Sequence, residues 1–346
     1  MTRLDSISTR LLYQLPRTAI AEGQKQLAQA QTEAATGRHA DMGMALGSRT
    51  GVTIGFRLRL DSVANTLDQV KLANSRAEIA QTSLSTLADL AKGFQSVLAG
   101  ARGAENGKTL ASTSGMLSLD AMQSTLSTTY DGQYIFGGLM SGSVPLSPYL
   151  AGPRQAVIGA FEARFGFPPS DPAASALSAA DIESFLDGAF SDLFEDTDWR
   201  STWSAASSEG MQFRVSTGGA IDLQTTADRP FARSLAQAFS MVEMLGSSSI
   251  SRDAFQAVAD RAMARISEAQ LQIGSEQARI GAGQARLKLA SEALERERRD
   301  FTSAINTLEG VDAYEAATRI NVLMTQLETS YALTGRINRL SLLSYI

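Results

Sequence analysis

The sequence predicts a mainly α-helical protein: an elongated stalk of antiparallel coiled-coil or bundled helices, with an inserted smaller domain of α+β or mainly β type. Two heptad repeats and one change of composition support this prediction. Bulky apolar residues recur every seventh position from 266 to 308, and 60–98 carries them at alternating three- and four-residue steps. Seven residues make almost two helical turns, so each repeat places one apolar stripe on a long helix that needs a partner. Prolines, both tryptophans and many phenylalanines gather between the two repeats.

Composition limits the classes of function. The chain of 346 residues is 44% hydrophobic but only 7% aromatic, has no cysteine, and carries a formal net charge of −5. This mix suits long helices that meet along thin seams rather than around one thick core. Basic residues are interleaved with acidic ones, so we expect no nucleic-acid binding. No stretch is apolar enough for membrane insertion, and we expect no cleavable signal peptide.

The first of five predicted segments, 1–36, is an assembly helix. Its apolar stripe consists of residues seven positions apart: Tyr13, Ile20, Leu27 and Ala34. So narrow a stripe makes a lone helix marginal in water, so we expect it to order only against another helix. Pro16 lacks a backbone donor and crowds the preceding turn, which predicts a kink or a fresh helix start near residue 15.

The second segment, 37–145, is predicted to form the first half of the stalk. Its main helix covers 60–98, and three polar residues interrupt the stripe: Asn74, Gln81 and Gln95. Such residues either fix register with a partner helix or lie at partly exposed seam positions. A Gly/Asn break at 100–107 precedes a further helix over 110–130, which we expect to run antiparallel to the first.

The third segment, 146–230, is predicted to be a compact inserted domain. Ser178 and Asp181 are spaced as an acidic version of the capping box and predict a helix over 178–194. Strands are expected near 154–167 and 211–225.

The fourth segment, 231–309, is predicted to form the second half of the stalk. Its seam comprises Ile266, Ile273, Ile280, Leu287, Leu294, Phe301 and Leu308. We expect this seam to pack on the helices at 60–98 and 110–130, with Asn74 and Gln81 setting the alignment. Glycine is costly inside a helix, so close helix–helix approach is the expected reason for Gly281 and Gly283.

The fifth segment, 310–346, is predicted to be a second assembly helix. Its stripe follows three-, four- and seven-residue steps through Ile320, Leu323, Leu327, Thr334 and Ile337. As in the first segment, the stripe is too narrow for a stable lone helix.

Few residues are candidates for chemistry. His39 is the only histidine and lies among small residues, so neither a histidine metal pair nor a Ser-His-Asp triad is expected. Gly107–Thr109 looks like the end of a phosphate-binding loop, but the glycine required at position 102 is an arginine. Glu195, Asp196 and Asp198 lack the spacing of a calcium loop. We therefore expect no enzyme, no cofactor and no metal site.

Several motifs resemble those of the flagellin superfamily. Thr36–Asp41 follows a Gln/Ala-rich helix and is similar to the superfamily's TG(K/R) turn, while Met42–Gly47 looks like the hook-associated protein 3 branch of alphaproteobacteria. Three more motifs resemble that branch: Gly132–Gly138, similar to GxYLFxG, Asp312–Ala317, and the ending Leu340–Ile346.

The resemblance implies a flagellin-like fold with paired terminal helices and a structural role in the bacterial flagellum. The role would be the junction layer between hook-associated protein 1 and the flagellin filament. The resemblance also implies self-assembly as a homo-oligomeric ring or helical layer, and type III export to the extracellular flagellum without a cleaved signal. An export chaperone is a further expected partner.

The residues expected to bind neighbouring subunits lie on the terminal stripes: Ile20, Leu27, Ile320, Leu323, Leu327, Ile337 and Leu340. The alternative is that they pair the two terminal helices within one chain, and both can hold at different stages. Alternative functions are filament flagellin, a secreted coiled-coil scaffold or effector, and an enzyme housed in 146–230.

Overall fold

The computed structural model describes the backbone of residues 9–210, 212–216, 219–223 and 225–343, and their side chains except those of 9–13, 15–16, 213–216, 219–220, 222 and 337–343. Helices dominate this part of the chain, which confirms the predicted mainly α-helical class. The chain divides into two compact units, Met1–Asn65 with Ala293–Ile346, and Thr66–Glu292. Two long helices, α3 (Thr50–Ala101) and α10 (Arg252–Glu309), contribute residues to both units.

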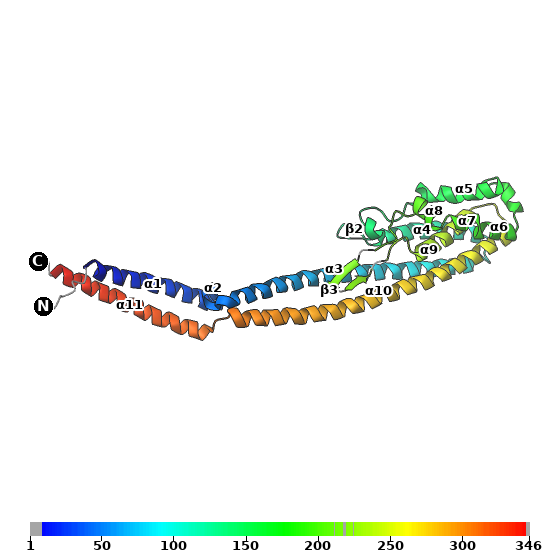
Figure 1. Cartoon of the computed structure of the whole chain (residues 1–346). Coiled ribbons are helices and arrows are strands. Elements are labelled where there is room, and N and C mark those ends of the chain that lie inside the picture. The colour runs from blue at the N-terminus through cyan, green and yellow to red at the C-terminus, as the bar shows by residue number, and fades with distance from the viewer. Residues whose placement is uncertain (1–8, 211, 217–218, 224, 344–346) are drawn as a thin grey trace. The chain divides into compact units, whose positions relative to one another are not determined.

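The first unit contains the paired terminal helices. α1 (Thr9–Thr36) lies along α11 (Ala313–Leu343), as Figure 1 shows. Gln24 Nε2 donates to Tyr331 Oη at 2.6 Å, and Arg319 Nη1 donates to Glu33 Oε2 at 3.2 Å. Partner numbers rise in one helix as they fall in the other, so the pair is antiparallel. Between α1 and α3 lie α2 (Met42–Leu46) and the 3-10 helix η1 (Gly47–Arg49).

Pro16 lies inside α1, which runs without interruption from Thr9 to Thr36. The predicted fresh helix start near residue 15 is therefore wrong. A proline in a helix interior removes one backbone hydrogen bond, but the residues on both sides of it keep helical backbone here.

The second unit contains an antiparallel pair formed by α3 and α10. Gln81 Nε2 donates to the Gln277 carbonyl at 2.8 Å, and Gln284 Nε2 donates to Asn74 Oδ1 at 3.4 Å. The two contacts lie seven residues apart on α3 and seven residues apart on α10. The helices therefore keep the same register from one contact to the next. Two of the three polar residues in the 60–98 stripe, Asn74 and Gln81, thus contact the partner helix.

α4 (Gly107–Leu126) turns back along α3 and packs on α9 (Pro230–Gly246). Thr82 of α3 and Thr125 of α4 line one groove, which agrees with the expected antiparallel course. Two glycines allow α4 and α9 to approach closely. A Cβ on Gly115 would lie 2.9 Å from the Phe239 carbonyl oxygen, and one on Gly246 would lie 2.8 Å from the Lys108 carbonyl oxygen.

The chain between α4 and α9 forms short elements around an aromatic core. They are β1 (Thr129–Tyr130), β2 (Gln133–Tyr134), η2 (Ile135–Met140), η3 (Tyr149–Ala151), α5 (Pro153–Phe165), η4 (Pro172–Ala176), α6 (Ala179–Asp187), α7 (Ala189–Asp192), α8 (Asp196–Thr202), β3 (Gln212–Ser216) and β4 (Gly219–Asp222). Phe161 packs edge-on against Phe185 at 5.4 Å between ring centroids, and Trp199 stacks on Trp203 at 5.5 Å. This core explains why aromatic residues concentrate here.

The short elements confirm some predictions and correct one. Ser178 and Asp181 form the expected capping box at the start of α6. β3 and β4 pair antiparallel, which confirms strands within 211–225. The strand expected at 154–167 is wrong, because this stretch is the helix α5. Pro153 is suited to a first helical turn, and Gly166 at φ 83° ends the helix in left-handed backbone.

Gly283 of α10 makes room for the β3–β4 hairpin. A Cβ there would overlap Leu223 Cδ2 and lie 3.6 Å from Ile221 Cγ2. The close neighbour of this glycine is thus a strand and the residue after it, not a helix as expected.

Candidate assembly surface

Small residues line the seam between α1 and α11. Ala30 and Ala316 are buried there, with Leu323 and Leu327 only 7% and 8% exposed. A Cβ on Gly23 would lie 3.0 Å from Leu327 Cδ2, so the two helices approach closely at this position. The pair therefore has a thin seam, as the narrow apolar stripes predict.

The structure places the predicted interface residues in different surroundings. Leu323 and Leu327 face the chain's own α1, while Ile20, Leu27 and Ile320 are half-buried. The side chains of Ile337 and Leu340 lie outside the described residues. Within one chain, the best-buried members of the set serve the helix pair.

A second set of apolar residues on α11 is exposed. It consists of Tyr314, Val322, Met324, Tyr331 and Leu333, whose exposed fractions run from 46% to 84%. At about 100° per residue, Val322 and Leu333 lie on one side of the seam, and Met324 and Tyr331 lie on the other. Both flanks of the helix pair are therefore apolar. The predicted stripes do not include this set, although Met324 and Tyr331 have heptad spacing, which is a signal for it.

Exposed apolar residues are concentrated in the first unit. Among the described side chains, nine of the eighteen large hydrophobic residues that are exposed belong to this unit, which holds about a third of the chain. Besides the five on α11, they are Met44, Val52, Ile54 and Leu58. Apolar groups gathered on one part of a surface commonly mark a site of protein contact.

The buried carboxylate of Glu309 fastens the end of α10 to α3 and to the turn after α1. Arg57 donates to it through both Nε, at 2.8 Å, and Nη2, at 2.5 Å. Arg38 Nη1 lies 3.5 Å from Glu309 Oε2. The hydrogen bond from Arg57 to this carboxylate raises the pKa of the guanidinium. We call Glu309 with these two arginines the Glu309 clasp.

Backbone contacts complete this junction. The His39 amide donates to the Glu309 carbonyl at 3.0 Å, and the Val311 amide donates to the Gly37 carbonyl at 3.0 Å. Gly37 has φ 67°, a left-handed conformation that favours glycine. The turn after α1 and the break between α10 and α11 are thus paired through both backbone and side chains.

Glu33 forms a second ionic junction beside the first. It accepts from Arg319 Nη1 at 3.2 Å and from the Ala40 amide at 3.2 Å, and His39 Nδ1 lies 3.7 Å from its Oε1. His39 is thereby placed in a structural turn.

The seam residues of α10 differ between the two units. Ile266, Ile273, Ile280 and Leu287, in the second unit, are at most 1% exposed. Leu294, Phe301 and Leu308, in the first unit, are half-buried. Phe301 packs against Phe56 at 5.8 Å between ring centroids. The seam therefore has free apolar surface only where it enters the first unit.

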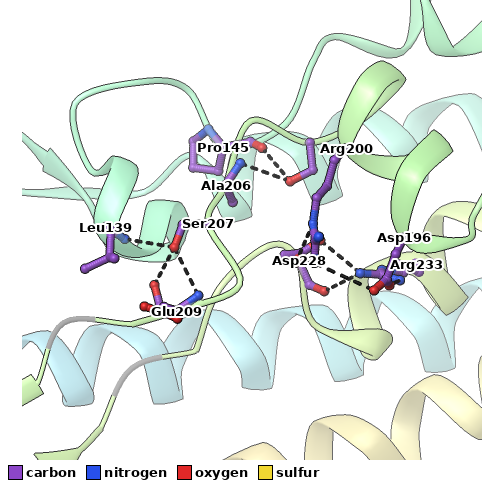
Figure 2. Close-up of polar contacts among 10 residues, drawn as sticks. Leu139, Pro145, Asp196, Arg200, Ala206, Ser207, Glu209, Asp228 and Arg233 are labelled. Carbon is purple, nitrogen blue, oxygen red and sulfur yellow. Dashed lines mark hydrogen bonds and ion pairs between the residues drawn. The ribbon is translucent and has the colours of Figure 1, made fainter.

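The other candidate residues are used structurally. Asp196 pairs with Arg233, whose hydrogen bond lowers the pKa of that carboxyl, and both Arg233 and Arg200 reach Asp228, as Figure 2 shows. Lys108 Nζ donates to the carbonyls of Ser248 and Ile250, at 3.0 and 2.6 Å, just beyond α9. The described residues contain no cluster of three metal-binding side chains, and none of their helices is apolar and long enough to span a membrane.

Comparison with known families decides the identity of the chain. The model of the bacterial flagellin N-terminal helical region matches residues 7–141, and that of the C-terminal helical region matches residues 263–346. Together they cover more than half of the chain. The chain belongs to the flagellin superfamily.

Flagellin-family proteins are structural, non-enzymatic components that self-assemble into the extracellular bacterial flagellum. In this flagellin-family protein the two matches include the terminal helices, the Glu309 clasp and most of α10, but not α5 to α9. No curated protein matches the chain.

Proposed function

We propose that this flagellin-family protein forms the junction layer between hook-associated protein 1 and the flagellin filament. The observation that carries the assembly part is the exposed apolar set on α11, four of whose members flank the α1–α11 seam, two on each side. The motifs at Gly132–Gly138, Asp312–Ala317 and Leu340–Ile346 support the junction role over a filament role.

The proposed mechanism is burial of the α11 flanks by neighbouring copies. Covering a large apolar side chain fully stabilises a contact by about 1.5–3 kcal/mol. One chain exposes five such residues on α11, so flanking neighbours supply the stability that the thin seam lacks. Ile20, Leu27, Ile320, Ile337 and Leu340 are proposed to join this interface. Leu323 and Leu327 would support it indirectly by holding the pair together.

The remaining parts of the proposal follow from the motif resemblance. The protein is exported through the flagellar type III pathway, with a chaperone covering its terminal helices until export. In the five-segment division that we propose, 1–36 and 310–346 assemble, 37–145 and 231–309 form the stalk, and 146–230 is the insertion.

Substitutions on one flank of α11 test assembly. Val322→Ser with Leu333→Ser removes one apolar flank without touching the seam, so the purified protein should keep its helix content but sediment as monomer where the parent polymerises. The matched control is Leu271→Ser, which changes a leucine of α10 that is 78% exposed in the second unit. Equal polymerisation of all three proteins would contradict assembly through this face.

A deletion strain and a copy count test the junction role. A strain without this protein should build hooks but shed unpolymerised flagellin into the medium. Quantitative mass spectrometry of isolated flagella should find only the few copies of a short layer. Thousands of copies per flagellum would instead identify a filament flagellin, and normal filaments in the deletion strain would exclude both roles.

A further inference from the structure

A small cavity lies in the second unit, where two connecting segments cross α3. Its walls are Ala73, Arg76, Ala77 and Ala80 of α3, with Ile135, Leu223 and Thr225 from the connections. It has about 10 Å³ of room for the centre of a water-sized molecule. The connections also contact each other, because the Ala227 amide donates to the Phe136 carbonyl at 2.9 Å.

Arg76 presents an uncompensated positive charge to this cavity. The residue is only 5% exposed, and its Nη1 donates to Gln133 Oε1 at 3.2 Å. Its Nε and Nη2 are buried without a hydrogen-bond partner, and no carboxylate in the described part of the chain forms an ion pair with it. Burial lowers the pKa of the guanidinium, yet arginine stays charged in proteins.

Two neighbouring hydroxyl groups, one of them on the cavity wall, also lack partners. Thr225 Oγ1, on the cavity wall, and Thr226 Oγ1 are both buried without a hydrogen bond among the described groups. A hydroxyl can donate as well as accept, so the site offers several donors and no anionic acceptor. Buried polar groups in proteins are generally satisfied, so these unpaired donors call for an acceptor that the described residues do not supply.

We propose that this cavity binds one small monovalent anion of halide size, held by the Arg76 guanidinium and the Thr225 hydroxyl. A water molecule could accept hydrogen bonds from these donors but would leave the buried charge of Arg76 unbalanced. An anion accepts the hydrogen bonds and also balances the charge. The small volume and the apolar walls exclude phosphate, sulfate and carboxylate ligands. The anion would fasten both connections to α3 and so hold the aromatic region to the helix pair of its unit.

Anion-dependent unfolding of the full-length protein tests this site. We expect the melting temperature of the second unit to rise by about 3–5 °C per tenfold increase in chloride above the dissociation constant, at constant ionic strength held with sodium gluconate. Arg76→Met should abolish the rise. Arg286→Met, which removes an exposed arginine of α10, should preserve it. Equal chloride dependence of the parent and Arg76→Met proteins would overturn the proposal.

Two further measurements do not depend on how well Arg76→Met folds. Thr225→Val should shift the half-saturating chloride concentration upward severalfold, and an unchanged value would exclude the threonine as a ligand. Crystals grown in sodium bromide should show an anomalous peak in the cavity. Density there without anomalous signal would identify water and overturn the proposal.

Discussion

The Glu309 side chain is held tightly, since its carboxylate is 1% exposed and meets two arginines. Removing one partner of a buried ion pair leaves the other unpaired, although Arg57 is half exposed and solvent weakens the effect. We expect Glu309→Gln to lower the free energy of unfolding by about 1–2 kcal/mol and to speed amide hydrogen exchange in α1 and α11. Glu315→Gln, at an exposed ion pair, is the control. Unchanged exchange in Glu309→Gln would contradict the clasp.

The capping box of α6 gives a second prediction for single residues. Hydrogen bonds from the Ser178 hydroxyl and amide lower the pKa of Asp181. A folded-state pKa below the unfolded one stabilises the fold above the unfolded pKa, and this contribution is lost as the pH falls through the folded value. Ser178→Ala should therefore raise the pKa of Asp181 in an NMR titration. An unchanged Asp181 titration would show that the hydroxyl bond has no effect.

Among the elements, long helices were predictable and short ones less so. α3 and α10 follow heptad repeats over many turns, and repetition makes such a pattern unambiguous. Val157 and Phe161, four residues apart, form the buried face of α5, but a short apolar stretch such as 154–167 fits a strand equally well. The position of Gly283 against the hairpin depends on a contact between residues far apart in sequence, which no local pattern contains.

The crossing of α4 and α9 gives a prediction for the elements. Gly115→Ala would place a methyl group 2.9 Å from the Phe239 carbonyl oxygen, so the helices must move apart. Overpacking of this kind costs about 1–3 kcal/mol. Gly274→Ala in α10 is the matched control, because nothing lies within 4 Å of its added Cβ. There the better helix propensity of alanine should raise the free energy of unfolding by up to about 1 kcal/mol. Chemical denaturation should therefore show that Gly115→Ala lowers the free energy of unfolding and that Gly274→Ala raises it.

At the scale of the whole molecule, the division of the terminal apolar residues into buried and exposed ones was only partly predictable. The stripes through Ile20 and Leu323 identified the terminal helices, because periodicity indicates which residues share a face. Periodicity does not indicate which of two apolar faces the chain covers itself. That choice requires the partner helix, and the structure shows α1 covering Leu323 and Leu327 while Val322 and Leu333 stay exposed.

Proteolysis of the full-length monomer tests the expected marginal stability of the ends. Cleavage requires local opening of the backbone, and the thin α1–α11 seam opposes opening less than the well-buried core of the second unit. Brief digestion should remove both ends and leave a core of roughly 40–310. In the assembled protein, the same peptide bonds should resist cleavage. Equal resistance of monomer and polymer would show that neighbouring copies do not stabilise these helices.

The shared register of α3 and α10 restricts how the chain can change in length. Asn74 meets Gln284 and Gln81 meets Gln277, so one heptad on α3 corresponds to one heptad on α10. Loss of a single codon from either helix would rotate every later side chain on it by about 100° relative to its partner. Viable length variants of this protein should therefore differ by compensated heptads, gained or lost at two sites about 200 codons apart in the gene.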